Sequence, residues 1–105
     1  IMIITTGEQI PGKKITKILG ISRGSTVRSR NIGRDIIAAL KNMVGGEIVE
    51  YTRLQAEARE QALQRMEEDA QKMGADAIIS VRIQTSMIMD NASEMLFYGT
   101  AVKLD

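Results

Sequence analysis

A long amphipathic helix is the feature of this sequence that most constrains its fold. Small and apolar residues recur every three or four positions over residues 52–73, which predicts a helix of about 30 Å with one face against the rest of the protein. Thr52 with Gln55 three residues later is typical of a capping box, and Gly74 is typical of a left-handed C-cap. Because the stripe is rich in alanine, we expect a sheet or another helix to pack closely against it. Its members are Leu54, Ala58, Ala62, Met66, Ala70 and Met73.

A second, shorter helix is predicted over residues 31–44, before the long one. Asn31 can cap an apolar stripe that ends at Val44, and the pair Gly45 and Gly46 follows. A glycine pair beside helix ends also suggests a phosphate cradle. The wider pattern of a Walker or dinucleotide-binding loop is missing, which favours the simpler interpretation that these glycines end the helix.

Four segments have the composition and alternation of strands. They are residues 2–6, 14–27, 77–89 and 95–104. Pro11-Gly12 and residues 90–93 predict turns, the latter closing a hairpin. Within the second segment, Gly20 is interpreted as a bulge or a point of close approach and Gly24 as a bend.

The elements follow in the order β-β-α-α-β-β, which predicts the α+β class, with an antiparallel sheet packed by two helices. A single domain spans residues 1–105. Only 3% of the residues are aromatic, so the core must consist mainly of aliphatic side chains and methionine. Association of several subunits would compensate for such a thin core.

The residue types that carry most catalysis are absent. The chain has no histidine and no cysteine, which excludes Ser-His and Cys-His nucleophiles and the usual ligands of zinc and copper(II). Asp35, Glu47 and Glu50 are the carboxylates that remain for catalysis, and no paired spacing singles them out. We therefore predict no enzyme activity and no cofactor. No signal peptide or membrane-spanning run is visible, so we expect a cytoplasmic protein without a membrane partner.

Charge is unevenly distributed although the net charge is only +1. Residues 1–46 carry eight cationic side chains against two acidic ones, whereas residues 47–105 carry six against eleven. Arg23, Arg28, Arg30 and Arg34 crowd one segment and could bind phosphate or RNA. No aromatic residue lies among them to stack on a base, so we do not expect a nucleic-acid partner, and an anion site or salt bridges between subunits fit equally well.

Three methionines lie near the predicted hairpin. Met87, Met89 and Met95 could place thioethers together, and thioethers suit soft ions such as Cu(I). Filling gaps in an aromatic-poor core is the favoured explanation for them.

Seven short motifs follow one another along nearly the whole chain. They are Thr5-Thr6, Ile10-x-Gly12, Asn31-Ile32-x-Arg34-Asp35, Val44-Gly45-Gly46 followed by Tyr51, Ala58-Arg59-Glu60-x-Ala62, Gly74-Ala75-Asp76-Ala77 and Gly99-Thr100-Ala101-Val102. In this order they resemble the YbjQ family, small bacterial and archaeal proteins of unknown function. The resemblance implies a dodecin-like subunit that forms a homopentamer, or a decamer of two stacked rings. It also implies a heavy-metal-binding label, which this chain could meet only with methionines or carboxylates.

A ligand site is predicted where several of these motifs could converge. Its candidate residues are Thr5, Thr6, Arg34, Asp35, Gly45, Gly46, Tyr51 and Arg59. Glycines allow a ligand to approach the backbone, and the two arginines could hold an anion. The favoured alternative is that the same residues lock subunits together, through Arg34 with Glu50 or Arg59 with Asp35.

These observations predict a non-enzymatic homo-oligomer that binds a small anionic ligand or an ion at its subunit interfaces. A heavy-metal-binding protein, and a binder of RNA or other anions through the basic N-terminal half, are the alternatives.

Overall fold

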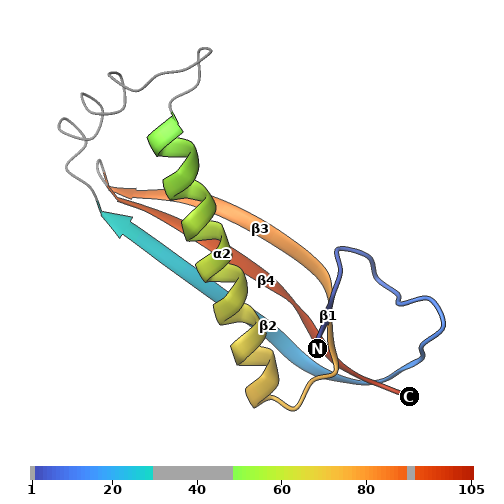
Figure 1. Cartoon of the computed structure of the whole chain (residues 1–105). Coiled ribbons are helices and arrows are strands. Elements are labelled where there is room, and N and C mark those ends of the chain that lie inside the picture. The colour runs from blue at the N-terminus through green and yellow to red at the C-terminus, as the bar shows by residue number, and fades with distance from the viewer. Residues whose placement is uncertain (1, 30–48, 90–91) are drawn as a thin grey trace.

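The computed structural model describes residues 2–29, 49–89 and 92–105. Strands β1 (Ile3–Ile4) and β2 (Ile15–Ser29) precede the helix α2 (Val49–Lys72), and strands β3 (Ala77–Met89) and β4 (Ala92–Leu104) follow it. The three long strands lie side by side, and α2 crosses them on one face (Figure 1). Within the described part of the chain, no helix is long and apolar enough to span a membrane.

The four strands form one mixed sheet in the order β1-β3-β4-β2. β4 is antiparallel to both β3 and β2, but β1 runs parallel to β3. The prediction of an antiparallel sheet is therefore wrong at β1, because two paired residues carry no sequence signal for direction. The prediction of two packed helices is also wrong, since one helix, α2, covers the sheet in the described residues. The helix expected over residues 31–44 lies outside them.

Helix α2 starts before its predicted N-cap and ends as predicted. It begins at Val49, so Thr52 lies inside the helix and the predicted capping box is wrong. At the other end Gly74 has φ +80°, which confirms the left-handed C-cap. The Ala75 N–H donates to the Ala70 carbonyl at 3.1 Å and the Gly74 N–H to that of Gln71 at 3.0 Å, the two bonds of a Schellman motif.

The long strands match their predicted segments closely. Residues 77–89 form β3 as predicted, whereas β2 ends two residues later and β4 begins three residues earlier than predicted. β4 begins at Ala92, so half of the predicted hairpin turn is strand. Gly20 has φ +134° at a register shift between β2 and β4, which confirms the predicted bulge.

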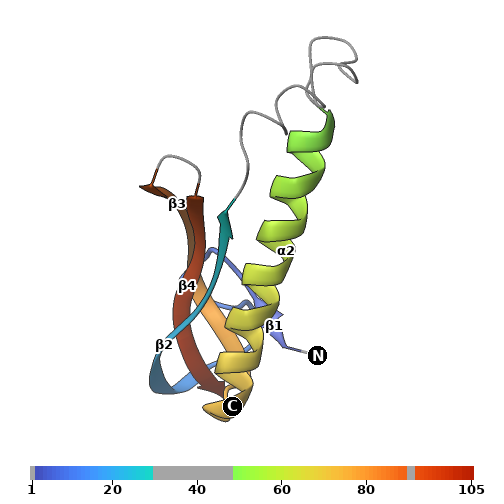
Figure 2. The same ribbon diagram turned by 90° about the vertical axis from the view of Figure 1, so that its left-hand side faces the viewer.

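Helix α2 lies directly on β2. Ser22 Oγ donates to the Met66 carbonyl at 2.7 Å, and Thr26 Oγ1 donates to the Ala58 carbonyl at 3.2 Å. Between them, a Cβ on Gly24 would meet backbone atoms of the helix. Gly24 is therefore not a bend, and its missing side chain lets the two backbones touch. Figure 2 shows the helix running along β2.

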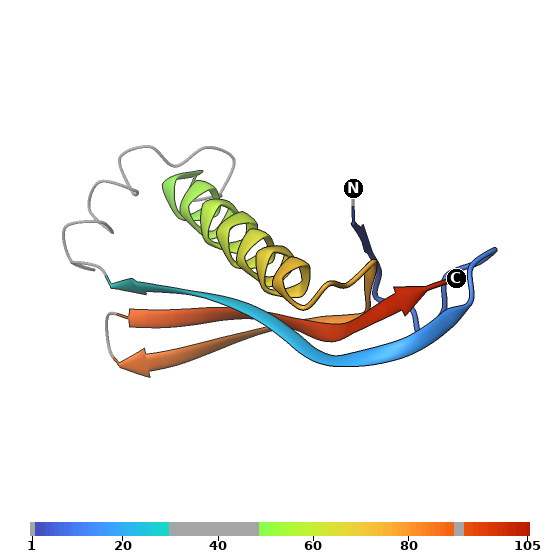
Figure 3. The same cartoon turned by 90° about the horizontal axis from the view of Figure 1, so that it is seen from below.

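The two faces of the sheet bury separate apolar clusters. Met66 and Ala70 of α2 pack on Ile78 and Ala101, on the helix-covered face. Ala77, Ile79 and Val102, which point the other way, pack with Ile10, Ile15 and Leu104. Figure 3 shows α2 on one side of the sheet, whereas no helix of the described residues covers the other side. We call this second side the open face, and on β2 it carries Ile18, Ile21, Arg23, Ser25 and Val27.

Candidate functional site

A turn after β1, at residues 5–7, is bonded onto the side of β3. The Thr5 N–H donates to the Ile78 carbonyl at 3.0 Å, and the Val81 N–H donates back to the Thr5 carbonyl at 3.1 Å. The Ser80 N–H donates to the Gly7 carbonyl at 2.9 Å. Three backbone hydrogen bonds therefore hold the predicted site residues Thr5 and Thr6 beside the first third of β3.

β3 contains a bulge at this point. Its pairing with β4 passes from Ile79 to Arg82 with one residue too many, and Ser80 adopts φ 54°, a conformation that residues with a side chain rarely adopt. Val81 consequently packs in the core under α2. Without the extra residue, Val81 would lie opposite Tyr98 and Arg82 would face the helix. The bulge thus turns Arg82 to the open face.

The guanidinium of Arg82 is held in place by the same turn. Its Nη1 donates to the Thr6 carbonyl at 3.0 Å and to the Val81 carbonyl at 2.8 Å. Both bonds use one nitrogen, so within the described residues Nη2 and Nε–H are left for another acceptor. Among the described residues, no carboxylate forms an ion pair with Arg82.

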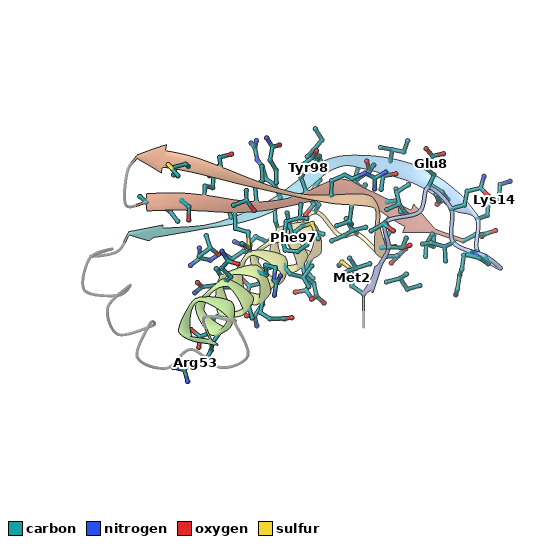
Figure 4. The ribbon with its side chains drawn as sticks, turned by 90° about the horizontal axis from the view of Figure 1, so that it is seen from above. Met2, Glu8, Lys14, Arg53, Phe97 and Tyr98 are labelled. Atoms are coloured by element: carbon teal, nitrogen blue, oxygen red, sulfur yellow. The ribbon has the colours of Figure 1, made fainter. Side chains whose placement is uncertain are left out.

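Arg82 is part of a row that crosses three strands. Tyr98 of β4 pairs directly with Arg82 of β3 on one side and with Arg23 of β2 on the other. Figure 4 shows Tyr98 on the side of the sheet away from α2, with Phe97 on the helix side. Both arginines are exposed and Tyr98 is half-buried. The row therefore presents an aromatic ring between two cations on the open face.

The predicted ligand site does not come together within the described part of one subunit. Arg59 is exposed on α2, next to Ala58, which contacts Thr26 near the far end of the sheet. Thr5 lies near Ile78, about 20 Å away along β4 at about 3.4 Å per residue. Arg34, Asp35, Gly45, Gly46 and the side chain of Tyr51 lie outside the described residues, so the ligand site and its interface alternative both stay predictions.

The predicted arginine cluster is only partly described. Arg23 lies on the open face, whereas Arg28 is described only by its backbone pairing with Ser93. Arg30 and Arg34 lie outside the described residues.

Sequence reasoning missed Arg82 and Tyr98. Both faces of β3 are apolar at its start, so the alternation gives no sign of the slip between Ile79 and Val81. The partner of Tyr98 follows from the strand register, which no local motif encodes.

One carboxylate near the C-terminus is electrostatically perturbed. A hydrogen bond from the Leu104 N–H to Asp76 Oδ2 at 2.8 Å lowers the pKa of Asp76 below its usual value, and Lys103 Nζ, 3.6 Å from Oδ1, acts in the same direction. Asp76 is exposed and fastens the end of β4 to the start of β3, which is a structural role.

Comparison with known proteins decides the family. A family model described as "Putative heavy-metal-binding" matches residues 2–105. The chain belongs to the YbjQ family. A UPF0145 protein of Methanosarcina acetivorans is 55% identical over 103 residues, which cover 98% of this chain and 97% of the relative. UPF0145 proteins of Thermotoga maritima and Archaeoglobus fulgidus are 54% and 52% identical over 99% and 98% of this chain, covering 98% and 95% of their own lengths. These matches confirm the predicted resemblance to the YbjQ family. None of the relatives' names describes an enzyme.

The fold recurs in a solved structure. The crystal structure of a protein of unknown function from Pediococcus pentosaceus, of the DUF74 family, is similar with a TM-score of 0.66. The match covers 99% of this YbjQ chain and 98% of the other chain. Because the sequences are only 18% identical, it shows a shared fold and nothing about function.

The residues that the structure describes offer no metal site built from cysteine, histidine or clustered carboxylates. The chain has no cysteine or histidine, and within residues 2–29, 49–89 and 92–105 no three acidic residues gather where they could hold an ion. Met95 and Met87 lie on the same face as diagonal neighbours, with Met87 78% exposed. The side chain of Met89 is not described, so the Cu(I) candidates stay a prediction.

Proposed function

We propose that this YbjQ protein is a non-enzymatic homo-oligomer that binds a small ligand at its subunit interfaces. The observation that carries this proposal is a row of exposed aliphatic side chains on the open face of β2. Ile21 is 71% exposed, Ile18 68% and Val27 55%. Covering a β-branched side chain of this kind contributes about 1–2 kcal/mol. A second copy of the chain is the occupant that we propose.

The shape of the subunit supports this occupant. Its radius of gyration is 17.1 Å, whereas a compact domain of this length has about 13 Å. The principal extents of 53 × 28 × 18 Å describe a thin slab with little interior. Contact between slabs supplies the buried area that one subunit lacks. The two halves of the sequence carry opposite net charges, which contacts between copies would pair.

The contact is expected on the open face rather than along the edge of β2. In the middle of that edge, the Arg23 N–H donates to Asp69 Oδ2 at 3.2 Å, and the Ser25 carbonyl accepts from Arg65 Nη1 at 2.6 Å. Helix side chains thus occupy backbone groups that an added strand would need. A homopentamer, or a decamer of two such rings, is the assembly that we expect.

Native mass spectrometry with light scattering tests the proposal. Ile21→Lys places a charge in the proposed contact and should shift the protein to monomers. Met87→Lys is the matched control, because Met87 is equally exposed but lies on the helix-covered side of the sheet. A wild-type monomer at micromolar concentration, or an Ile21→Lys variant that assembles normally, would refute the proposal.

A further inference from the structure

We propose that the row Arg23–Tyr98–Arg82 binds a mononucleotide, with the base on the ring of Tyr98 and the phosphate between the two guanidinium groups. This inference deepens the proposed function, because the row lies between Ile21 and Val27 on the surface through which we expect subunits to meet. The row itself lies within one subunit, so its chemistry can be tested apart from assembly.

The spacing of the row suits a bound phosphate. Neighbouring strands are about 4.8 Å apart, so the Cα atoms of Arg23 and Arg82 are separated by about 10 Å across Tyr98. Arginine side chains are long enough to converge over the ring from that distance. Neither guanidinium forms an ion pair with a carboxylate of the described residues. A phosphate between them would neutralise both cations through bidentate hydrogen bonds.

The Arg82 side is preorganised for such a contact. The Thr6 and Val81 carbonyls hold Nη1, and the strained bulge at Ser80 is what brings Arg82 to this face. Strained backbone persists where the surrounding structure enforces it and is common at binding sites. The positive φ of Ser80 and the turn at residues 5–7 together fix the guanidinium of Arg82 beside Tyr98. This arrangement explains two features that otherwise have no stated role.

The aromatic ring selects the rest of the ligand. A base stacks on the accessible face of an aromatic ring without regard to sequence, and the neighbouring phosphate then lies within reach of the cations. The next pairs along the open face are Ser25 and Gln84 across Leu96, then Val27 and Ser86 across Glu94. These positions add no second stacking ring, and they add an acidic residue. One base and one phosphate match this surface better than a polynucleotide does, which also agrees with the net charge of +1.

Adenosine monophosphate is the probe for the test, with adenosine and inorganic phosphate as its separate halves. The chain has two tyrosines and no tryptophan, so a 3-fluorotyrosine label gives two fluorine resonances, and the Tyr98→Phe variant identifies the one that belongs to Tyr98. We expect saturable shifts of its fluorine resonance with the monophosphate on the assembled protein. Each half alone should bind at least about tenfold more weakly, since each makes only part of the contacts. Calorimetry gives the affinity independently.

Variants separate a specific site from general charge. Arg82→Gln and Arg23→Gln should each weaken binding by about tenfold or more, Tyr98→Ala should abolish it, and Tyr98→Phe should keep it. Lys72→Gln is the control, because it removes the same charge from the exposed end of α2. Circular dichroism and native mass spectrometry check that each variant is folded and assembled.

Three outcomes would overturn the inference. The first is no fluorine shift at millimolar monophosphate on an assembled protein, which would leave the assembly proposal intact. The second is an equal loss of affinity in Lys72→Gln and Arg82→Gln. The third is that an oligoadenylate of ten nucleotides binds more than about 100-fold more tightly than the monophosphate, with a steep salt dependence. That result would indicate that the row binds RNA. A monomeric protein that still binds the monophosphate through Tyr98 would instead refute the assembly proposal alone.

Discussion

Replacing Gly24 with alanine is expected to force α2 away from the sheet. The added Cβ would lie 2.7 Å from the carbonyl carbon of Arg65 and closer still to backbone atoms of Ala62 and Met66. Because these are backbone atoms, no side-chain rotation can relieve the overlap, and the helix must move by most of an ångström. The hydrogen bonds on either side, from Ser22 at 2.7 Å and Thr26 at 3.2 Å, would then lengthen beyond a useful distance.

The expected cost combines both effects. Overpacking of a tight contact costs about 1–3 kcal/mol, and each lost hydrogen bond adds about 1 kcal/mol. The sum, about 3–5 kcal/mol, is a large part of the free energy of unfolding of an ordinary domain. Urea unfolding followed by circular dichroism measures it. The protein concentration must be fixed, because association makes stability depend on concentration.

Gly7→Ala is the matched control for this experiment. A Cβ on Gly7 would lie 3.5 Å from Thr5 Oγ1, an ordinary contact, and Gly7 has no positive φ. Its unfolding should match the wild type within about 0.5 kcal/mol. If Gly24→Ala unfolds at the same urea concentration as Gly7→Ala, the backbone contact is refuted. Rescue of Gly24→Ala by Ala62→Gly would also contradict it, because only a side-chain clash could be relieved in that way.

Three further predictions concern the helix end, a carboxylate and metals. Gly74→Val should lower the free energy of unfolding by more than about 1 kcal/mol, seen as a lower melting temperature, because φ is +80° at this position. Gly74→Asn should keep most of the stability. The lowered pKa of Asp76 means that its carboxylate stabilises the fold above about pH 4 and that this contribution is lost as the pH falls. Asp76→Asn should therefore flatten the acid end of the pH–stability curve, and equal acid losses in both proteins would contradict this. Calorimetry should detect no stoichiometric sub-micromolar site for zinc or copper(II), because the chain supplies no imidazole or thiolate.

The features that followed from sequence are those set by local chemistry. The β-branched run of β3 and the glycine after α2 each determine their structure within a few residues, and both predictions are confirmed. Gly20 belongs to the same group, because its missing side chain suits the bulge that the structure has there.

The features that sequence reasoning missed depend on partners distant along the chain. Gly24 looks like a bend until α2 is placed against it, more than thirty residues later in the sequence. The parallel direction of β1 depends on where β3 lies in the sheet. Likewise the site on the open face exists because the bulge at Ser80 shifts Arg82 opposite Tyr98, and nothing near Ser80 in the sequence marks that shift.

The position of β2 in the sheet also has a consequence for folding. β3 and β4 follow each other directly in the sequence, with Met89 paired to Ala92. Their hairpin can therefore form within microseconds. β2 pairs with β4 only by bringing Ser29 to Ala92 and Ile15 to Leu104, so every one of its pairs closes a loop of more than half the chain. β2 is therefore the last of the three long strands to dock, and until then β4 has an open edge. At high concentration the β2 of a neighbouring chain competes for that edge, which makes strand exchange the characteristic misfolding route of this topology.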